Sequence, residues 1–340
     1  MKAALITGVS GQDGSYLAEL LLTKNYTVYG MVRFCSEKKN GRIDHLKVHP
    51  EFHLIEGDLT DTSRINKIVN SFEQYDLIEV YNLGAITYVK ASFDQPEYTA
   101  TVDALGTLRV LEAIRQSNFS SKFRFYQAGT SEMFGKIVEP VQNEETPFYP
   151  RSPYGVAKLF AYWMTRNYRE SFNLYTCTGI LFNHESERRG PEFVTRKITL
   201  GLAEYLKSKT PIELGNIDAK RDWGHAEDYV EMMWRMLQQD APDDFVIATG
   251  ETHSVREFIE EACSVLDIKI EWRDDMYIDL ATGNPIIVIN PDFYRPAEVD
   301  VLIGDSSKAL KTLNWKPKTT FKDLVKRMVL FDCNGTIHRT

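Results

Sequence analysis

Residues 7–14 read TGVSGQDG, and this glycine-rich turn indicates the fold class of the chain. Its glycines are three residues apart and follow a short apolar segment, KAALIT at 2–7. Glycine has no Cβ atom, so the backbone can turn sharply and approach a pyrophosphate at the start of a helix. Residues 15–24, SYLAELLLTK, are apolar at helical spacing. A strand before the glycines and a helix after them favour a dinucleotide-binding turn over a tight turn without a ligand.

Strand-like and helical patterns alternate through the N-terminal half. Strands are predicted at 27–33, 52–58, 78–83, 123–128 and 175–181, and helices at 98–117 and 153–171. Strands that alternate with helices form a parallel sheet covered on both faces. We therefore predict an α/β fold whose doubly wound, Rossmann-like parallel sheet occupies residues 1–182.

The pattern changes after residue 182, where short turn-rich segments separate single helices. We expect residues 183–340 to form mainly a smaller, interleaved substrate-binding domain with a discontinuous boundary. The segment DFVIATG at 244–250 is expected to return to the main sheet, so that parts of 215–250 rejoin the first domain. Residues 276–300 are predicted to be loop or short strands.

Composition limits the possible partners. The 340 residues are 43% hydrophobic and 26% charged, as in an ordinary globular protein, and the net charge of -8 argues against a nucleic-acid partner. We predict no membrane segment, because no apolar run approaches the roughly 20 residues that span a bilayer. The cysteines are far apart and lack zinc or redox spacing, which predicts no metal site and reduced thiols in a cytoplasmic protein, with an oxidised pair left open: Cys35, Cys177, Cys263 and Cys333.

The end of the second strand bears on the choice of coenzyme. Folds that bind NAD usually place there an acid that accepts from the ribose 2′-hydroxyl. Here the strand ends at Arg33, and no acid follows before Glu37. Arg33 suits a 2′-phosphate, so NADP is favoured over NAD, with a surface arginine as the alternative. Asp58 is a candidate acceptor from the adenine amino group, and residues 83–85 offer a second close-backbone turn.

The segment SPYGVAK at 152–158 carries a candidate base. Tyr154 and Lys158 are four residues apart and so share a helix face. Ser152 is a plausible N-cap and Pro153 fits the first helical position. Tyr154 would then lie near the positive end of the helix dipole. That field and the Lys158 ammonium predict a lowered pKa, which suits a general base. A core tyrosine beside a surface lysine is the alternative.

A carboxylate lies just beyond the strand at 123–128. The segment QAGTSEMFG at 127–135 carries Glu132. Strand ends in open parallel sheets favour ligands. Glu132 is therefore either a loop charge or part of the chemistry.

Together, TG-x-x-G-x-x-G and Y-x-x-x-K resemble the extended short-chain dehydrogenase/reductase family. Longer blocks across most of the chain, among them PFYPRSPYGVAKLFAYW and RDWGHAEDYV, resemble one branch, the GDP-mannose 4,6-dehydratase family. The resemblance implies a lyase that converts GDP-mannose to GDP-4-keto-6-deoxymannose, the first step toward GDP-6-deoxyhexoses such as GDP-fucose or GDP-rhamnose.

The resemblance also implies roles for individual residues. Tyr154, supported by Lys158, takes the C4 hydroxyl proton while hydride passes to NADP. Glu132 removes the C5 proton and protonates the water that leaves from C6, and the hydride returns to C6. Thr130 hydrogen-bonds the C4 oxygen. NADP would be tightly bound, because it is regenerated in each cycle.

Binding residues follow from the same resemblance. The implied cofactor contacts are Gly8, Ser10, Gly11, Gln12, Asp13, Arg33, Asp58, Leu59, Leu83, Gly84, Ala85, Thr87, Tyr98, Lys158, His184 and Arg189. The implied substrate contacts are Asn183, Val194, Lys197, Leu214, Gly215, Arg221, Arg295 and Glu298. Arg221 and Arg295 suit the diphosphate and Glu298 the ribose hydroxyls, although each could instead form a surface ion pair. Taken alone, His184 would be a structural histidine.

Some positions depart from the family pattern. Gly129 stands where we expect serine, Phe134 where we expect tyrosine, and Glu187 where we expect proline. The segment 32–46 departs from an arginine- and serine-rich loop, so we expect a homodimer and leave a tetramer open. Gly129 and Glu187 motivate a hypothesis: with NADPH, the enzyme also reduces its 4-keto product to a GDP-6-deoxyhexose such as GDP-rhamnose.

Three other functions stay open at this point. A nucleotide-sugar epimerase needs the tyrosine and lysine but no carboxylate for elimination, so Glu132 argues against it. A dehydratase for another nucleotide sugar is the second, because the guanine preference rests on the resemblance alone. An inactive NADPH-binding regulator is the third, and it would not need all of the catalytic residues.

Overall fold

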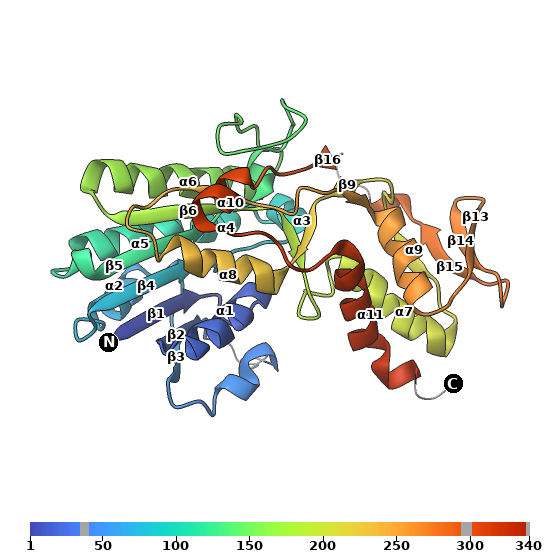
Figure 1. Cartoon of the computed structure of the whole chain (residues 1–340), viewed down its shortest axis with the longest axis horizontal. Coiled ribbons are helices and arrows are strands. Elements are labelled where there is room, and N and C mark those ends of the chain that lie inside the picture. Colours follow the sequence, from blue (N-terminus) through green and yellow to red (C-terminus); the bar gives the residue numbers. More distant parts are fainter. Residues whose placement is uncertain (35–40, 294–300, 338–340) are drawn as a thin grey trace.

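The computed structural model describes residues 1–34, 41–293 and 301–337 (Figure 1). A seven-stranded sheet forms the centre of the larger of two units, in the order β11-β6-β5-β4-β1-β2-β3, and neighbouring strands are parallel throughout. The predicted doubly wound α/β fold is confirmed. The strands are β1 (Lys2–Thr7), β2 (Thr27–Val32), β3 (Phe52–Glu56), β4 (Leu77–Asn82), β5 (Phe123–Ala128), β6 (Tyr175–Leu181) and β11 (Phe245–Ile247).

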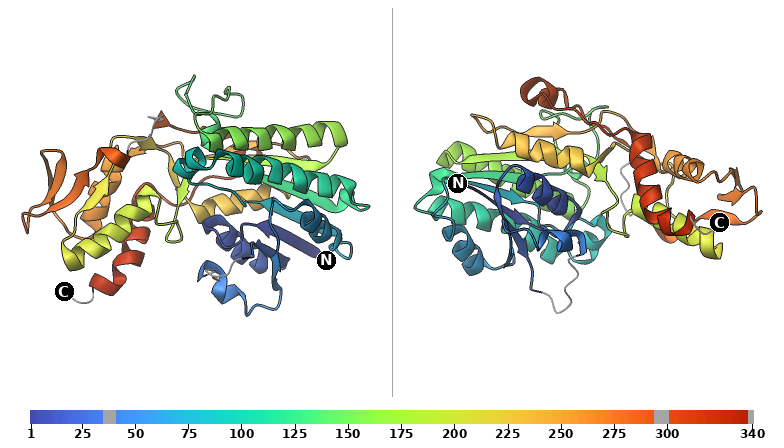
Figure 2. Two further views of the ribbon diagram at one scale, coloured as in Figure 1. Left: turned by 180° about the vertical axis from the view of Figure 1, so that it is seen from behind. Right: turned by 60° about the horizontal axis from the view of Figure 1, so that its bottom comes forward.

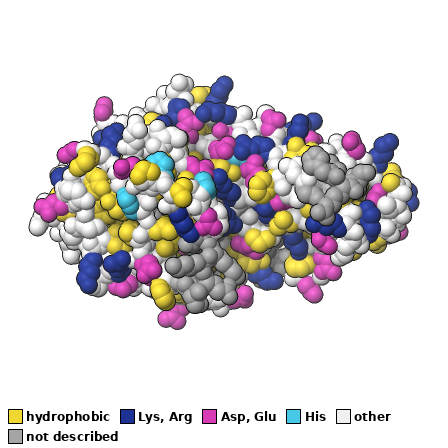
Figure 3. Space-filling model, turned by 90° about the horizontal axis from the view of Figure 1, so that it is seen from below, with side chains coloured by type: hydrophobic (Ala, Val, Ile, Leu, Met, Phe, Trp, Pro, Cys, Tyr) yellow, Lys and Arg dark blue, Asp and Glu magenta, His cyan; other side chains and the backbone are white. Residues whose placement is uncertain are grey.

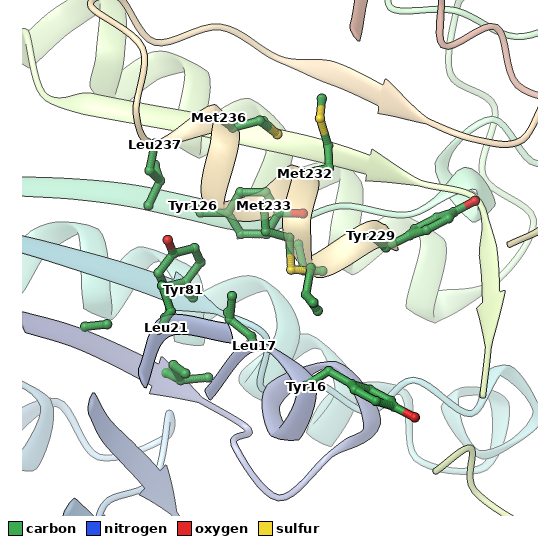
Figure 4. Close-up of a cluster of buried hydrophobic side chains, with 14 of the residues drawn as sticks. Tyr16, Leu17, Leu21, Tyr81, Tyr126, Tyr229, Met232, Met233, Met236 and Leu237 are labelled. Carbon is green, nitrogen blue, oxygen red and sulfur yellow. The ribbon is translucent and has the colours of Figure 1, made fainter. Parts of the chain in front are cut away.

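One face of this sheet is covered by α1 (Gln12–Thr23) and α8 (Ala226–Met236). Leu17 and Leu21 of α1 lie in the same buried cluster as Met233 of α8, with aromatic rings from the strands beneath (Figure 4). Each large apolar side chain buried in this way contributes roughly 1.5–3 kcal/mol. The glycine-rich turn therefore leads into a helix that is anchored along its length.

The opposite face is covered by α2 (Thr62–Asn70), α5 (Leu105–Gln116) and α6 (Pro153–Phe172). The two views of Figure 2 show α5 and α6 on one side of the sheet and α1 on the other. Burial on both faces explains why the strands are almost continuously apolar rather than alternating. The carboxyl ends of these strands meet at one edge, where loops can build a site.

The helix predicted at 98–117 is interrupted. It comprises α4 (Pro96–Thr99), a π-helical turn (Ala100–Ala104) and α5. Thr107 Oγ1 donates to the Asp103 carbonyl at 3.1 Å. A Cβ atom on Gly106 would lie 2.9 Å from Leu59 Cβ, so α5 starts in close contact with the turn after β3. Such π turns occur often at functional sites.

The smaller unit packs three helices beside a four-stranded sheet with its own apolar core. The segment 276–300, predicted to be loop or short strands, supplies β14 and β15 of this sheet. The helices are α7 (Val194–Ser208), α9 (Val255–Val265) and α11 (Phe321–Ile337). The sheet order is β13 (Ile270–Arg273), β14 (Met276–Asp279), β15 (Pro285–Ile289) and β8 (Ile212–Leu214).

Short elements join the two units. After residue 182 the chain returns to the larger unit twice, through α8 with β11 and through α10 (Ser307–Leu313). The connecting elements are β7 (Asn183–Glu185), β9 (Lys220–Arg221), β10 (Trp223–His225), β12 (His253–Ser254) and β16 (Val301–Leu302). The short helix α3 (Val89–Asp94) packs against α6 of the larger unit. Short 3-10 turns lie at Gly41–Leu46, Ser120–Lys122, Ser131–Met133 and Pro291–Phe293.

The surface seen from below carries basic and acidic side chains interspersed with one another (Figure 3). Among the helices that the structure describes, none is long and apolar enough to cross a membrane.

Three of the four cysteines, Cys177, Cys263 and Cys333, are buried and not bridged, and Cys35 lies outside the described residues.

Candidate active site

The turn between β1 and α1 depends on glycine at two positions. Gly8 has φ +71°, and a Cβ atom there would lie 2.9 Å from Cα of Gly84. A Cβ atom on Gly14 would lie 2.5 Å from the Gly8 carbonyl oxygen. Gly11 is the N-cap of α1 and, in the part of the chain that the structure describes, no side-chain cap hydrogen bond is made at this position, so the first amides of the helix are left open there. Free amides at a helix N-terminus favour an anion such as a phosphate.

These amides face the first cavity, which measures about 300 Å³. It is also lined by residues that were not among the implied cofactor contacts: Thr7, Gly14, Met31, Val32, Gly57, Ile86 and Val102. They continue the strand ends and turns that were predicted, so the pattern of strands could have indicated them. The predicted cofactor residues that line it are Gly8, Ser10, Gly11, Gln12, Asp13, Arg33, Asp58, Leu59, Leu83, Gly84, Ala85, Thr87 and Arg189.

Arg33 lies at the rim of this cavity, directly after β2. Its Nη1 atom donates to the Tyr98 hydroxyl at 2.8 Å, so Tyr98 orients Arg33 although it does not itself line the cavity. Arg42 donates to the carbonyl oxygens of Ser10 at 3.3 Å and Arg188 at 2.7 Å. Arg42 therefore ties the glycine-rich turn to the segment that carries Arg189.

Asp13, which lines the first cavity, forms a hydrogen-bonded pair with His184. His184 Nε2 lies 2.7 Å from Asp13 Oδ2, and Nδ1 lies 2.8 Å from the Phe182 carbonyl oxygen. The imidazole also stacks on Tyr229. Burial is the largest influence on both groups and opposes their charges, but the partner's charge and the hydrogen bonds together outweigh it, so the pKa of His184 is raised and that of Asp13 is lowered. Both ring nitrogens are engaged, and His184 thus fixes the position of Asp13.

A second cavity, of about 140 Å³, holds all of the predicted catalytic residues. It shares Asp13, Leu83, Thr87 and Arg189 with the first cavity, so the two are adjacent. Its predicted members are Asp13, Leu83, Thr87, Thr130, Glu132, Tyr154, Lys158, Asn183, His184, Arg189 and Arg221. Members that were not predicted to bind are Tyr88, Val89, Ala128, Gly129, Ser131, Leu181, Phe182 and Phe193.

The start of α6 places Tyr154 in this cavity. Ser152 Oγ accepts from the Gly155 amide at 3.1 Å and Pro153 occupies the first turn, so the predicted cap is confirmed. A Cβ atom on Gly155 would lie 2.7 Å from the Glu132 carbonyl oxygen. The helix therefore begins directly against the backbone of Glu132.

Glu132 is held by the turn that follows β5. Thr130 Oγ1 accepts from the Glu132 amide at 3.2 Å, which starts the short 3-10 turn Ser131–Met133. Glu132 is half-buried and lines the second cavity. Its negative charge also acts on the Tyr154 hydroxyl. The carboxylate and the phenol thus lie within one electrostatic environment.

The predicted lowering of the Tyr154 pKa is wrong. Burial raises this pKa, and the charges of Asp103 and Glu132 raise it further, while a hydrogen bond with Thr130 opposes them. Lys158 Nζ donates to the Ala128 carbonyl at 2.9 Å and lies 5.8 Å from the Tyr154 ring centroid. Burial also lowers the pKa of Lys158. The sequence argument considered the helix dipole and the lysine but not burial or these two carboxylates.

The six predicted substrate residues that the structure describes divide into two groups. Asn183 and Arg221 line the second cavity, but Val194, Lys197, Leu214 and Gly215 line neither. Phe293 connects two of the latter: Lys197 Nζ lies 3.8 Å from its ring centroid, and a Cβ atom on Gly215 would lie 2.9 Å from its carbonyl oxygen. Arg295 and Glu298 lie outside the described residues.

The three residues that depart from the expected family pattern lie in different parts of the structure. Gly129 lines the second cavity, whereas Phe134 and Glu187 line neither. Glu187 accepts from Tyr16 and from Arg327, each at 2.9 Å. It therefore joins α1 of the larger unit to α11 of the smaller one. Within the described residues, no group of His, Cys, Asp and Glu could hold a metal ion.

Known proteins share this sequence over nearly its whole length. A family profile described as GDP-mannose 4,6 dehydratase matches residues 5–328. The GDP-mannose 4,6 dehydratase of Drosophila melanogaster is 55% identical, over 97% of this chain and 86% of the relative. The human protein of the same description is 53% identical, over 97% of this chain and 91% of its own length.

Solved structures share the fold at lower identity. The UDP-glucose 4-epimerase of Thermotoga maritima, determined with UDP-glucose, superimposes with a TM-score of 0.82. It is 20% identical and covers 98% of this chain and 99% of its own. At that identity the likeness establishes the fold alone.

Proposed function

The chain belongs to the GDP-mannose 4,6-dehydratase family, and we propose that it converts GDP-mannose to GDP-4-keto-6-deoxymannose. The reaction comprises C4 oxidation, elimination of water across C5 and C6, and hydride return to C6. One observation carries this proposal: Glu132 shares a cavity with Tyr154 and Lys158. An epimerase needs only the last two, because it eliminates nothing.

We propose NADP as the coenzyme, in the first cavity. The residues fit the group: glycine backbones that a Cβ atom would obstruct lie beside an open helix N-terminus, and Arg33 stands at the end of β2. The helix amides would hold the pyrophosphate and Arg33 the 2′-phosphate. When bound, NADP would accept the C4 hydride and return it to C6.

The chain's own residues move the protons. Tyr154 accepts the C4 hydroxyl proton, and Lys158, anchored on the Ala128 carbonyl, supplies the nearby positive charge. The 4-keto group acidifies C5, and Glu132 takes the C5 proton and gives it to the hydroxyl that leaves C6. Return of the hydride to C6 leaves an enolate that takes a proton at C5, and the proton that Tyr154 accepted from the C4 hydroxyl balances this step. Thr130 steadies the C4 oxygen by hydrogen bonding.

The GDP moiety would extend from the second cavity into the smaller unit. Arg221 lines that cavity and suits the diphosphate, because guanidinium groups bind phosphate oxygens bidentately. Phe193 lines the same cavity and immediately precedes α7, which carries Val194 and Lys197. These residues and the group around Phe293 offer a path for the nucleotide. Arg295 and Glu298 stay predictions.

We also propose a homodimer. Val156, Phe160 and Trp163 form an exposed apolar stripe on α6, at helical spacing. A second copy of the chain would cover this stripe, and a tetramer stays open. A cytoplasmic location and the division into domains at residue 182 stay predictions.

Reduction of the 4-keto product stays a hypothesis that rests on Gly129. A Cβ atom there would lie 2.8 Å from the Gly179 carbonyl oxygen, so the expected serine would displace the end of β5 beside Thr130. Excess NADPH with GDP-mannose, followed by chromatography, tests the hypothesis. A GDP-6-deoxyhexose supports it, and recovery of the 4-keto sugar alone contradicts it.

The dehydration itself is tested by incubating the purified protein with GDP-mannose and NADP. The molecular mass of the product is then measured by mass spectrometry. We expect a product lighter by one water, without accumulation of NADPH. A product of unchanged mass would instead indicate an epimerase. Parallel assays with other nucleotide-linked hexoses test the guanine preference.

A further inference from the structure

Asp103 is a buried carboxyl group that the proposed reaction does not use. Its side chain is 2% exposed. Oδ1 accepts from the Ile86 amide at 2.8 Å, whereas Oδ2 has no hydrogen-bond partner among the described residues. A buried polar atom left without a partner destabilises the folded state. Such an atom is uncommon in a folded protein and calls for an explanation.

The position of Asp103 relates it to both cavities. It lies in the π-helical turn Ala100–Ala104, which packs against α6, the helix of Tyr154 and Lys158. Val102 beside it and its partner Ile86 line the first cavity. Asp103 itself lines neither cavity. The carboxyl group therefore lies behind the site and acts on it through other residues.

The charge of Asp103 acts on both members of the tyrosine–lysine pair. Burial lowers the pKa of Lys158, and the Asp103 carboxylate is the strongest influence in the opposite direction. Burial raises the pKa of Tyr154, and the same carboxylate raises it further. Burial also raises the pKa of Asp103, and the positive charge of Lys158 opposes that shift. An ionised Asp103 thus favours the ammonium and disfavours the phenolate.

We propose that Asp103 is a positioning residue of this reaction, and the proposal rests on the proposed function. Its buried carboxylate holds Lys158 in the charged form beside Tyr154. It thereby sets the pH range in which Tyr154 can accept the C4 hydroxyl proton. The unpartnered oxygen is explained, because its charge is balanced by Lys158 rather than by a hydrogen bond.

Other groups face this pair and must be considered in any pH profile. From the other packed elements, Glu132 and Arg189 act on Tyr154, and Asp13 acts on Lys158. Asp13 is in turn paired with His184. Since all of these charged groups remain when Asp103 is replaced, only the contribution of Asp103 to the pKa values of Tyr154 and Lys158 changes.

The test is the pH dependence of kcat for Asp103→Asn. Asparagine keeps the size and an acceptor for the Ile86 amide but removes the charge. Without the carboxylate the Tyr154 phenolate forms at lower pH, and Lys158 loses its proton at lower pH. We expect both limbs of the profile to move to lower pH, each by on the order of one unit. If kcat falls equally at every pH while both limbs stay in place, the role is structural and the proposal is wrong.

Asp222→Asn is the matched control. Asp222 is equally buried, but its oxygens accept from Thr249, Gly250 and Gly304. This variant should lower the melting temperature and leave both limbs in place. If Asp103→Asn does not fold, Asp103→Ser replaces it as a smaller neutral residue. The same shift supports the proposal, and unmoved limbs contradict it.

A second readout separates this proposal from the proposed function. The phenolate of Tyr154 can be titrated by ultraviolet difference absorbance in the NADP-bound protein, with Tyr154→Phe as the reference. The Tyr154 transition should move to lower pH in Asp103→Asn. This result does not depend on the substrate, so a wild-type enzyme that leaves GDP-mannose unchanged would refute the function alone. An unshifted transition would refute the role of Asp103 alone.

Discussion

The two cavities differ in what shapes them: backbone contacts shape the first, and side chains shape the second. The first is shaped by backbone: close contacts at Gly8 and Gly14 leave the strand ends and helix amides facing the cavity. The second is shaped by side chains from several elements, among them Glu132, Tyr154 and Arg221. A cavity shaped by close backbone contacts should be damaged by any added side-chain atom. A cavity lined by charged side chains should instead be sensitive to changes of charge. The predictions below test this difference, beginning with the largest expected effect.

Replacing Glu132 by glutamine should have the largest effect on turnover. The amide cannot take the C5 proton, so kcat for dehydration should fall by about 10²–10⁴-fold while NADP affinity is kept. Mass spectrometry of the product measures kcat for dehydration. Displacement of fluorescent NADPH by NADP measures the NADP affinity. Glu145→Gln, an exposed carboxylate outside both cavities, is the control and should keep full activity. Equal losses in both variants would contradict the role of Glu132.

Replacing Gly8 by alanine should damage the first cavity. The backbone conformation at φ +71° costs a residue with a side chain about 1–3 kcal/mol, and the new methyl group meets Gly84. We expect a lower melting temperature and NADP affinity reduced by on the order of 10-fold or more, the latter because the displaced turn no longer fits the pyrophosphate.

Gly283 provides the matched control for this prediction. Its φ is +72°, but nothing lies within 4 Å of an added Cβ atom, and it lines neither cavity. Gly283→Ala should lower the melting temperature through strain and leave NADP affinity unchanged. If Gly8→Ala also kept its NADP affinity, the first cavity would not depend on its backbone.

Replacing Arg33 by alanine should affect only the choice of coenzyme. Loss of a charged hydrogen bond to the 2′-phosphate, worth about 1.5–3 kcal/mol, should weaken NADP by on the order of 10–100-fold and leave NAD unaffected. Dissociation constants for both coenzymes measure this. An unchanged ratio of the two would contradict the assignment of Arg33.

Replacing Glu187 by glutamine should change stability more than activity. Burial raises the pKa of Glu187, but hydrogen bonding with His225 and the ion pair with Arg327 outweigh it, so the folded-state pKa is lowered. A lowered pKa means that the carboxylate stabilises the fold above its unfolded pKa of about 4.3, and that this contribution is lost as the pH falls. The melting temperature of the variant should therefore be lower at neutral pH and converge with that of the wild type in acid. A changed product would contradict a purely connecting role.

The first cavity was predictable because the sequence specifies it locally. Glycine spacing, strand ends and Arg33 lie within short segments, and the structure brings them together. The second cavity was predicted less completely. Tyr154, Lys158 and Glu132 meet there, but the direction of the Tyr154 pKa shift was wrong, because Asp103 comes from a distant helical turn. An acid within the otherwise apolar run TVDALG was the available signal.

The substrate residues show the same limit. Lys197 and Gly215 meet at Phe293, a contact that depends on how α7 and β8 pack and that no spacing reveals. Glu187 was predicted to affect the product, yet it joins α1 to α11. Patterns along the chain thus indicate sites made by consecutive residues. Sites made between units need the structure.

The measurement that tests the account most directly follows one labelled hydride. GDP-mannose carrying deuterium at C4 is incubated with the NADP-bound enzyme, and the product is analysed by NMR. The account predicts a 4-keto product that has lost one water and carries the deuterium at C6. The coenzyme proposed for the first cavity would take the deuteride from C4 and return it to C6 after Glu132, in the second cavity, has promoted loss of the C6 hydroxyl. Deuterium that remains at C4 of a product of unchanged mass, or that is lost to solvent, would contradict it.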